Sequence, residues 1–132
     1  MKFPIFTIFL FVPIFLLGTL FPAFASDSVE RQAIQSATTF LHLVDNGDCA
    51  DSWSVAATIF QKGISREDWI QRVAVVRKSL GPLQERSQLN AKYTNNLPGA
   101  PGGEYVVIFF KTKFQNKEEA IETVTVVLEG DG

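Results

Sequence analysis

The chain has 132 residues, a formal net charge of −2 and one cysteine. This length suits a single domain built around one hydrophobic core. The mild acidity, spread without long runs of one sign, offers no surface that attracts nucleic acid or anionic lipid. A single cysteine, Cys49, excludes an internal disulfide, so the core alone must hold the fold.

The first 25 residues resemble a secretory signal peptide. Lys2 is the only charge before an apolar stretch over residues 3–21, and Ala23-Phe24-Ala25 fits a small-x-small cleavage site. We expect cleavage after Ala25, a single domain over 26–132, and export to the periplasm or the medium. The alternative is an uncleaved N-terminal membrane anchor, because the stretch approaches the ~20 residues that span a bilayer. Two prolines and a glycine interrupt the stretch, which favours removal.

Three helices are predicted in the first half of the remaining chain. Apolar residues recur at spacings of three and four over residues 27–45, 48–60 and 65–80. Asp27 with Glu30 resembles a capping box, and Ser65 with Asp68 repeats that signal. Trp53 and Trp69 fall on the apolar stripes and are interpreted as core anchors rather than ligand platforms.

The second half changes to the period of strands. Residues 83–94 alternate as a half-exposed strand, residues 97–103 form a Pro-Gly loop, and residues 104–114 are apolar without alternation, as in a central strand. After a turn at 114–117, residues 120–129 alternate again. The chain is therefore predicted to be an α+β domain, with three N-terminal helices packed on a short antiparallel sheet. Gly130-Asp131-Gly132 is a hairpin signal, so we expect a final strand to be missing.

These elements resemble those of an uncharacterised bacterial group, domain-of-unknown-function family 4019. The resemblance rests on segments spread over nearly the whole domain: Leu43–Asp48, Ser52-Trp53, Trp69, Arg77, Leu80-Gly81, Leu97–Pro101, Gly103–Val107, Lys117, Ala120 and Glu122–Val124. It implies a cone-shaped, cystatin-like or nuclear-transport-factor-like α+β fold, exported and without an established activity. Members of that family normally continue into a last strand with a Trp-Arg pair, which this sequence lacks.

No local signature of catalysis or cofactor binding is recognisable. The sequence has no G-x-S-x-G, P-loop, G-x-G-x-x-G, H-E-x-x-H or C-x-x-C motif. The only histidine, His42, is predicted to face water, and Cys49 to be a buried, inert thiol. Asp45, Asp48 and Asp51 lack the order of an EF-hand loop, so capping and solubility explain them better than a cation site. We therefore predict no catalytic residues, no metal and no cofactor.

The favoured hypothesis is a non-catalytic module that binds a small ligand or a protein. Its predicted ligand-binding residues are Tyr93, Glu104 and Tyr105, beside the Pro-Gly loop, because long loops carried on a rigid sheet often hold binding residues. The loop is equally well interpreted as a stiff hairpin connection. The alternative function is a small pocket enzyme of the cone-shaped fold, with Tyr93, Glu104 and Asp45 as acid and base candidates from separate elements. An open edge over 120–129 would also permit a homodimer.

Overall fold

The computed structural model describes residues 5–7 and 24–129. Within these residues, four helices precede three long strands: α1 (Phe24–Asp45), α2 (Cys49–Ser54), α3 (Thr58–Gly63), α4 (Arg66–Leu80), β2 (Leu83–Thr94), β3 (Tyr105–Phe114) and β4 (Lys117–Val127). A three-residue strand, β1 (Ile5–Thr7), completes an antiparallel sheet of order β1-β4-β3-β2. The α+β class is confirmed, and so is the interior position of β3, which the sequence predicted as a central strand over residues 104–114.

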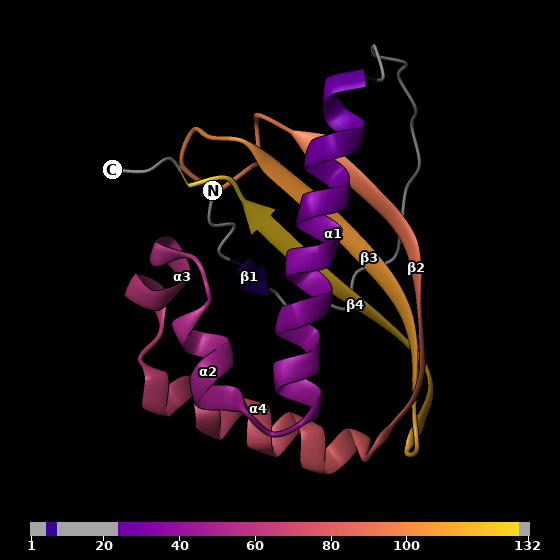
Figure 1. Ribbon diagram of the computed structural model, residues 1–132. Coiled ribbons are helices and arrows are strands. Elements are labelled where there is room, and N and C mark those ends of the chain that lie inside the picture. The colour runs from indigo at the N-terminus through magenta and orange to yellow at the C-terminus, as the bar shows by residue number, and fades with distance from the viewer. Residues whose placement is uncertain (1–4, 8–23, 130–132) are drawn as a thin grey trace.

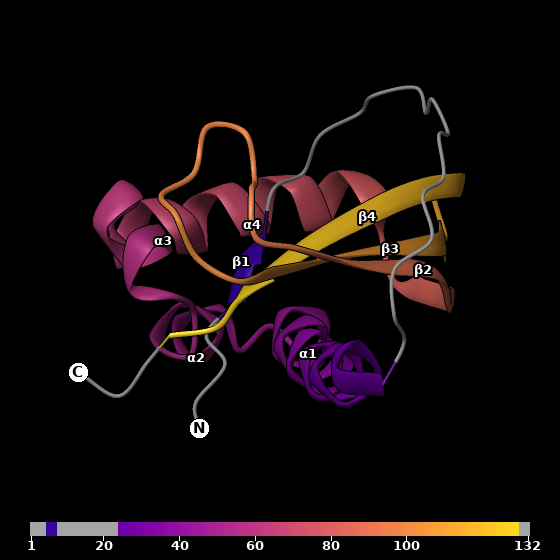
Figure 2. The ribbon, with the colours of Figure 1, turned by 90° about the horizontal axis from the view of Figure 1, so that it is seen from above.

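Helix α1 lies along one face of the sheet, and α4 crosses the end of the sheet at which the β3–β4 hairpin turns (Figure 1, Figure 2). Backbone hydrogen bonds fix that crossing. The Asn116 amide donates to the Leu80 carbonyl at 2.9 Å, and the Gln115 amide donates to the Pro82 carbonyl at 2.9 Å. The turn of the hairpin is thereby attached to the end of α4, where Gly81 adopts a positive φ of 73°.

The core lies between α1 and the face of the sheet that α1 covers. Alternate residues of β3 are buried, and the same alternation on β4 places apolar side chains opposite them. The main members of this core are Ala33, Ala37, Phe40, Leu41, Val44, Phe60, Trp69, Val73, Val106, Ile108, Phe110, Val124 and Val126. The face of the sheet that α1 covers is thus occupied by packed side chains along much of its length.

Both tryptophans act as anchors, as predicted. Trp69 is 5% exposed, packs edge-on against Phe60 at 5.0 Å between ring centroids, and donates its indole proton to buried Ser52 at 2.9 Å. Trp53 is half-buried and donates to the Ile64 carbonyl at 3.0 Å. Because each indole N–H has a partner, the rings can be buried without an unpaired donor.

The predicted second helix, 48–60, was wrong as a single helix, because the chain breaks it into α2 and α3. Ala57 has extended backbone angles, and both it and Ala56 are buried. The side-chain amide of Gln61 donates to the carbonyls of Trp53 and Ser54, at 3.0 and 3.2 Å. The Trp53 carbonyl also accepts from the Ala56 amide at 3.1 Å, so both carbonyls at the break have partners and the break costs few hydrogen bonds.

The helix ends confirm one capping prediction and correct another. Ser65 accepts a hydrogen bond from the Asp68 amide at 3.1 Å, which confirms the cap of α4. Asp27 is not a cap, since α1 begins at Phe24 and Asp27 lies in its first turn. There the carboxylate still faces the positive end of the helix dipole. The apolar spacing over 65–80 includes Val76, but only Trp69 and Val73 of α4 are buried, and Val76 is 38% exposed.

The predicted leader contributes one element that the sequence analysis did not foresee. Ile5–Thr7 form β1, and Ile5 and Thr7 pair with Val126 and Val124 of β4. The edge that was predicted to be open therefore carries a strand at these positions. The hairpin signal at residues 130–132 lies outside the described residues. In the described helices, no segment is long and apolar enough to cross a membrane.

Candidate functional site

The three predicted ligand-binding residues lie together at the end of the β2–β3 hairpin. The Tyr93 hydroxyl donates to the Glu104 carboxylate at 2.8 Å. This hydrogen bond, helped by desolvation and by the carboxylate charge, raises the pKa of Tyr93 above its ordinary value. The two side chains thus bond to each other across the two ends of the Pro-Gly loop.

Tyr105 is buried and holds the Pro-Gly loop through a hydrogen bond. The residue is 5% exposed, and its hydroxyl donates to the Pro101 carbonyl at 2.6 Å. Glu104 and Tyr105 also border a crevice against Val29 and Ala33 of α1, but that crevice is too narrow to hold a water molecule. These contacts favour the interpretation of the loop as a stiff hairpin connection.

A second group of polar side chains converges on the helix-facing side of the sheet, near its α4 end. We call it the charge cluster, and it draws one residue from each of five elements: Asp45 of α1, Arg77 of α4, Arg86 of β2, Thr112 of β3 and Glu122 of β4. The side chains of the four charged members are 4–17% exposed. The cluster is therefore largely shielded from water.

Arg86 is the centre of the charge cluster. Its guanidinium donates to Glu122 at 2.8 and 3.1 Å, and to Asp45 at 2.6 and 3.1 Å. Burial alone would lower the pKa of Arg86, but its hydrogen bonds and charge interactions with the two carboxylates outweigh burial and raise that pKa. Both carboxylates are thus bound by a guanidinium that stays protonated.

Two further contacts complete the charge cluster. Arg77 donates to Asp45 and lies over the Phe114 ring, 5.0 Å from its centroid, while Thr112 donates to Glu122. All four carboxylate oxygens accept at least one hydrogen bond, and two positive charges balance two negative ones. A general base needs a lone pair that substrate can reach. The arrangement therefore fits a structural role better than proton transfer.

The sequence patterns did not indicate a structural role for Arg77, Arg86, Thr112 and Glu122, and they favoured capping and solubility for Asp45. That assignment was wrong, because Asp45 is bound by two arginines. One signal was available: Glu122 alternates with Ala120 and Val124, which places a carboxylate on a core-facing row. A charge on such a row requires an opposite partner. The identity of that partner depends on the tertiary structure.

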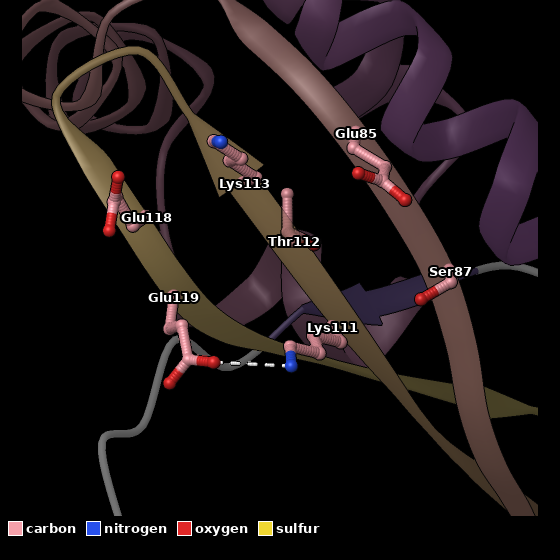
Figure 3. A pocket seen from close by; sticks show the side chains of 7 residues that line it. All are labelled: Glu85, Ser87, Lys111, Thr112, Lys113, Glu118 and Glu119. Atoms are coloured by element: carbon pink, nitrogen blue, oxygen red, sulfur yellow. Dashed lines mark ion pairs between the residues drawn. The ribbon is translucent and has the colours of Figure 1, made fainter.

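The opposite face of the same strands carries a shallow hollow, which we call the trough (Figure 3). Its volume is about 360 Å³, and its lining consists of Glu85, Ser87, Lys111, Thr112, Lys113, Glu118 and Glu119. Pockets for small molecules are mostly apolar and enclose their ligand. The trough is open and lined by polar residues, so it suits a polar surface rather than an apolar small molecule.

Most charges around the trough are unpaired. Lys111 and Glu119 form an exposed ion pair at 3.1 Å, whereas the head groups of Glu85, Lys113 and Glu118 stand apart (Figure 3). Within the described part of the chain, none of these three forms an ion pair. Glu85 and Lys113 are nonetheless directly opposite each other on β2 and β3. These charges remain available to a partner.

The remaining candidates have ordinary surroundings. His42 is exposed, as predicted, and lies 3.1 Å from the Asn46 side chain. Cys49 is half-buried, and burial raises the pKa of its thiol, which agrees with an inert cysteine. Among the described residues, no three His, Cys, Asp or Glu side chains are grouped so that they could hold a metal ion.

The fold and these surfaces define a small α+β domain in which the charges of the charge cluster are paired, whereas, over residues 5–7 and 24–129, three of the five charges around the trough are not. The family model described as "Protein of unknown function (DUF4019)" matches residues 36–132. Because this match covers most of the sequence, the chain belongs to the DUF4019 family, as its motifs indicated. No curated protein and no solved structure is similar enough to count as a match.

Proposed function

We propose that this protein is an exported, non-catalytic binding module that acts in the periplasm or outside the cell. The observation that carries the proposal is the contrast between its two charged regions. The charge cluster saturates its own carboxylates, whereas the trough holds exposed charges that remain unpaired around an open hollow. Exposed polar groups that are free of internal partners are the ones a second molecule can use.

The trough is the stronger of two candidate surfaces. At the loop, Tyr93 and Glu104 bond to each other, and Tyr105 bonds to the backbone, so a ligand there would have to break existing hydrogen bonds. At the trough, a ligand would engage Glu85, Lys113 and Glu118 without that cost. Tyr93, Glu104 and Tyr105 remain the proposed residues of the second surface.

Native mass spectrometry of the protein recovered from its export compartment tests this proposal. We expect a chain that begins at Ser26 and carries additional bound mass. Lys113→Glu should carry less of that mass than the unaltered protein, while Lys78→Glu, on an exposed position of α4, should carry as much. If Glu104→Gln loses the bound mass and Lys113→Glu does not, the binding site lies at the loop rather than at the trough. A processed chain without any bound mass would contradict a binding function.

The same spectrum addresses export and assembly. A chain that retains residues 1–25 would support the N-terminal anchor instead of cleavage. If the leader is removed, β1 is removed with it, and the uncharged edge at Val124–Val126 loses its neighbour. A free, uncharged strand edge favours pairing with another chain. A homodimer in the spectrum of the processed protein would support edge pairing, and a monomer would oppose it.

A second candidate function is a small pocket enzyme. The observation in its favour is that Asp45 and Glu122, from separate elements, are brought to one guanidinium. Broad substrate profiling of the purified protein tests this candidate. Turnover that Glu122→Gln abolishes, with folding retained, would establish an enzyme and displace the binding module. Absence of turnover over that range would favour the binding module.

A further inference from the structure

The charges around the trough follow a definite order across the sheet. The central strand, β3, contributes Lys111 and Lys113, while β2 contributes Glu85 on one side and β4 contributes Glu118 and Glu119 on the other. The order from strand to strand is therefore negative, positive, negative. All five side chains are exposed. A partner with complementary charges must present positive, negative and positive groups in that order.

The spacing of the strands sets the spacing of those groups. Neighbouring strands lie about 4.8 Å apart, so the two acidic rows are separated by about 10 Å. In an extended polypeptide, side chains on one face recur every second residue, or about 7 Å apart. Two basic residues four positions apart, with an acidic residue midway, span about 13 Å. Flexible lysine or arginine side chains can bridge the difference between the span of the peptide and the separation of the two acidic rows.

We propose that the trough binds an extended polypeptide segment of a partner protein with the pattern basic-x-acidic-x-basic, crossing β2, β3 and β4. This inference rests on the proposed binding function and specifies the class of its partner. The basic side chains reach Glu85 and the glutamates of β4, and the acidic one reaches Lys113. The open, polar shape of the trough suits a main chain that lies on the surface, since the lining offers little apolar area to a compact ligand.

The test uses the full chain and three synthetic peptides capped at both ends. The probe is Lys-Ser-Glu-Ser-Lys, the inverted control is Glu-Ser-Lys-Ser-Glu, and the uniformly basic control is Lys-Ser-Lys-Ser-Lys. Binding is followed by shifts of backbone amide resonances, with affinity expected in about the millimolar range. We expect the probe to bind more tightly than both controls and to shift the amides of Lys111 and Lys113. Equal binding of the inverted peptide would overturn the charge pattern.

Variants locate the binding and separate charge from folding. Exposed ion pairs are individually weak, so Lys113→Glu should reduce affinity for the probe about two- to fivefold, and higher salt should reduce it further. Lys78→Glu should leave the affinity unchanged. The double variant Glu85→Lys/Lys113→Glu should bind the inverted peptide more tightly than the unaltered protein does. If the double variant remains folded but does not bind the inverted peptide more tightly, direct recognition by the trough is refuted.

This inference and the proposed function can fail separately. If the native spectrum shows a partner that Lys113→Glu binds as fully as the unaltered protein does, the module binds elsewhere and only the trough inference is wrong. If the processed protein carries no partner, the proposed function itself is contradicted.

Discussion

The charge cluster and the trough are built from neighbouring residues of the same three strands. Arg86 and Glu85 are adjacent on β2, and Thr112 lies between Lys111 and Lys113 on β3. The pleat sends alternate side chains to opposite faces, so one set meets α1 and α4 while the other meets water. Desolvation then decides the difference: buried charges must be paired and hydrogen-bonded, whereas exposed charges are stable without a protein partner.

Removing a charged side chain from the buried charge cluster should have the largest effect on the free energy of unfolding. Glu122→Ala leaves the Arg86 guanidinium with one carboxylate and removes the acceptor of Thr112. Removal of one partner from a buried ion pair costs about 3 kcal/mol of the free energy of unfolding. Urea denaturation measures this loss. The matched control is Glu118→Ala in the trough, and an equal effect of both changes would show that the charge cluster is not effectively buried.

A double replacement tests whether that loss of stability arises because one buried charge is left without its partner. Arg86→Met/Glu122→Leu removes both charges together, and apolar replacement of a whole buried pair is often close to neutral. Because Asp45 and Arg77 still pair with each other, the double variant should be less destabilised than Arg86→Met or Glu122→Leu alone. The urea midpoints of the three variants check this order. Additive losses would mean that the two side chains contribute independently.

Changes on the exposed side should alter stability little. Lys111 and Glu119 are 53% and 78% exposed at the side chain, and solvent screens such pairs strongly. We expect Lys111→Ala and Lys113→Glu to change the free energy of unfolding by less than about 0.5 kcal/mol. Chemical denaturation tests this expectation. A loss as large as that of Glu122→Ala would assign the trough a structural role.

The smallest effect on stability is expected beside the Pro-Gly loop, where the hydrogen bond between Tyr93 and Glu104 is exposed. Titration can still detect this bond. The Glu104 carboxylate raises the pKa of Tyr93 in the folded protein, so the folded state favours the protonated phenol. This contribution to stability is present below the ordinary tyrosine pKa of about 10 and is lost as pH rises through the higher folded value. Ultraviolet titration should show Glu104→Gln lowering the pKa of Tyr93. Tyr93→Phe shows which part of the ultraviolet titration comes from Tyr93. If Glu104→Gln leaves that part unchanged, the hydrogen bond is contradicted.

Much of the fold could be predicted from the sequence. The apolar run of β3, which lacks alternation, identified it as a central strand, and the Ser65 cap located the start of α4. The break at Ala57 could not be predicted, because the apolar spacing continues through it and the compensating bonds come from Gln61 in the next helix. The residues of the predicted site are together, but their hydrogen bonds to each other and to the loop were not evident from the sequence.

The sequence by itself determined the α+β class, the family and the alternation of faces along the strands, because these depend on local periodicity and on recognisable motifs. Only the tertiary structure decided which charges are paired. Asp45 meets Arg77 and Arg86 across 32 and 41 residues of sequence. Contacts over such separations depend on how helices and strands pack, and packing also determines which face of the sheet is desolvated and which stays open to a partner.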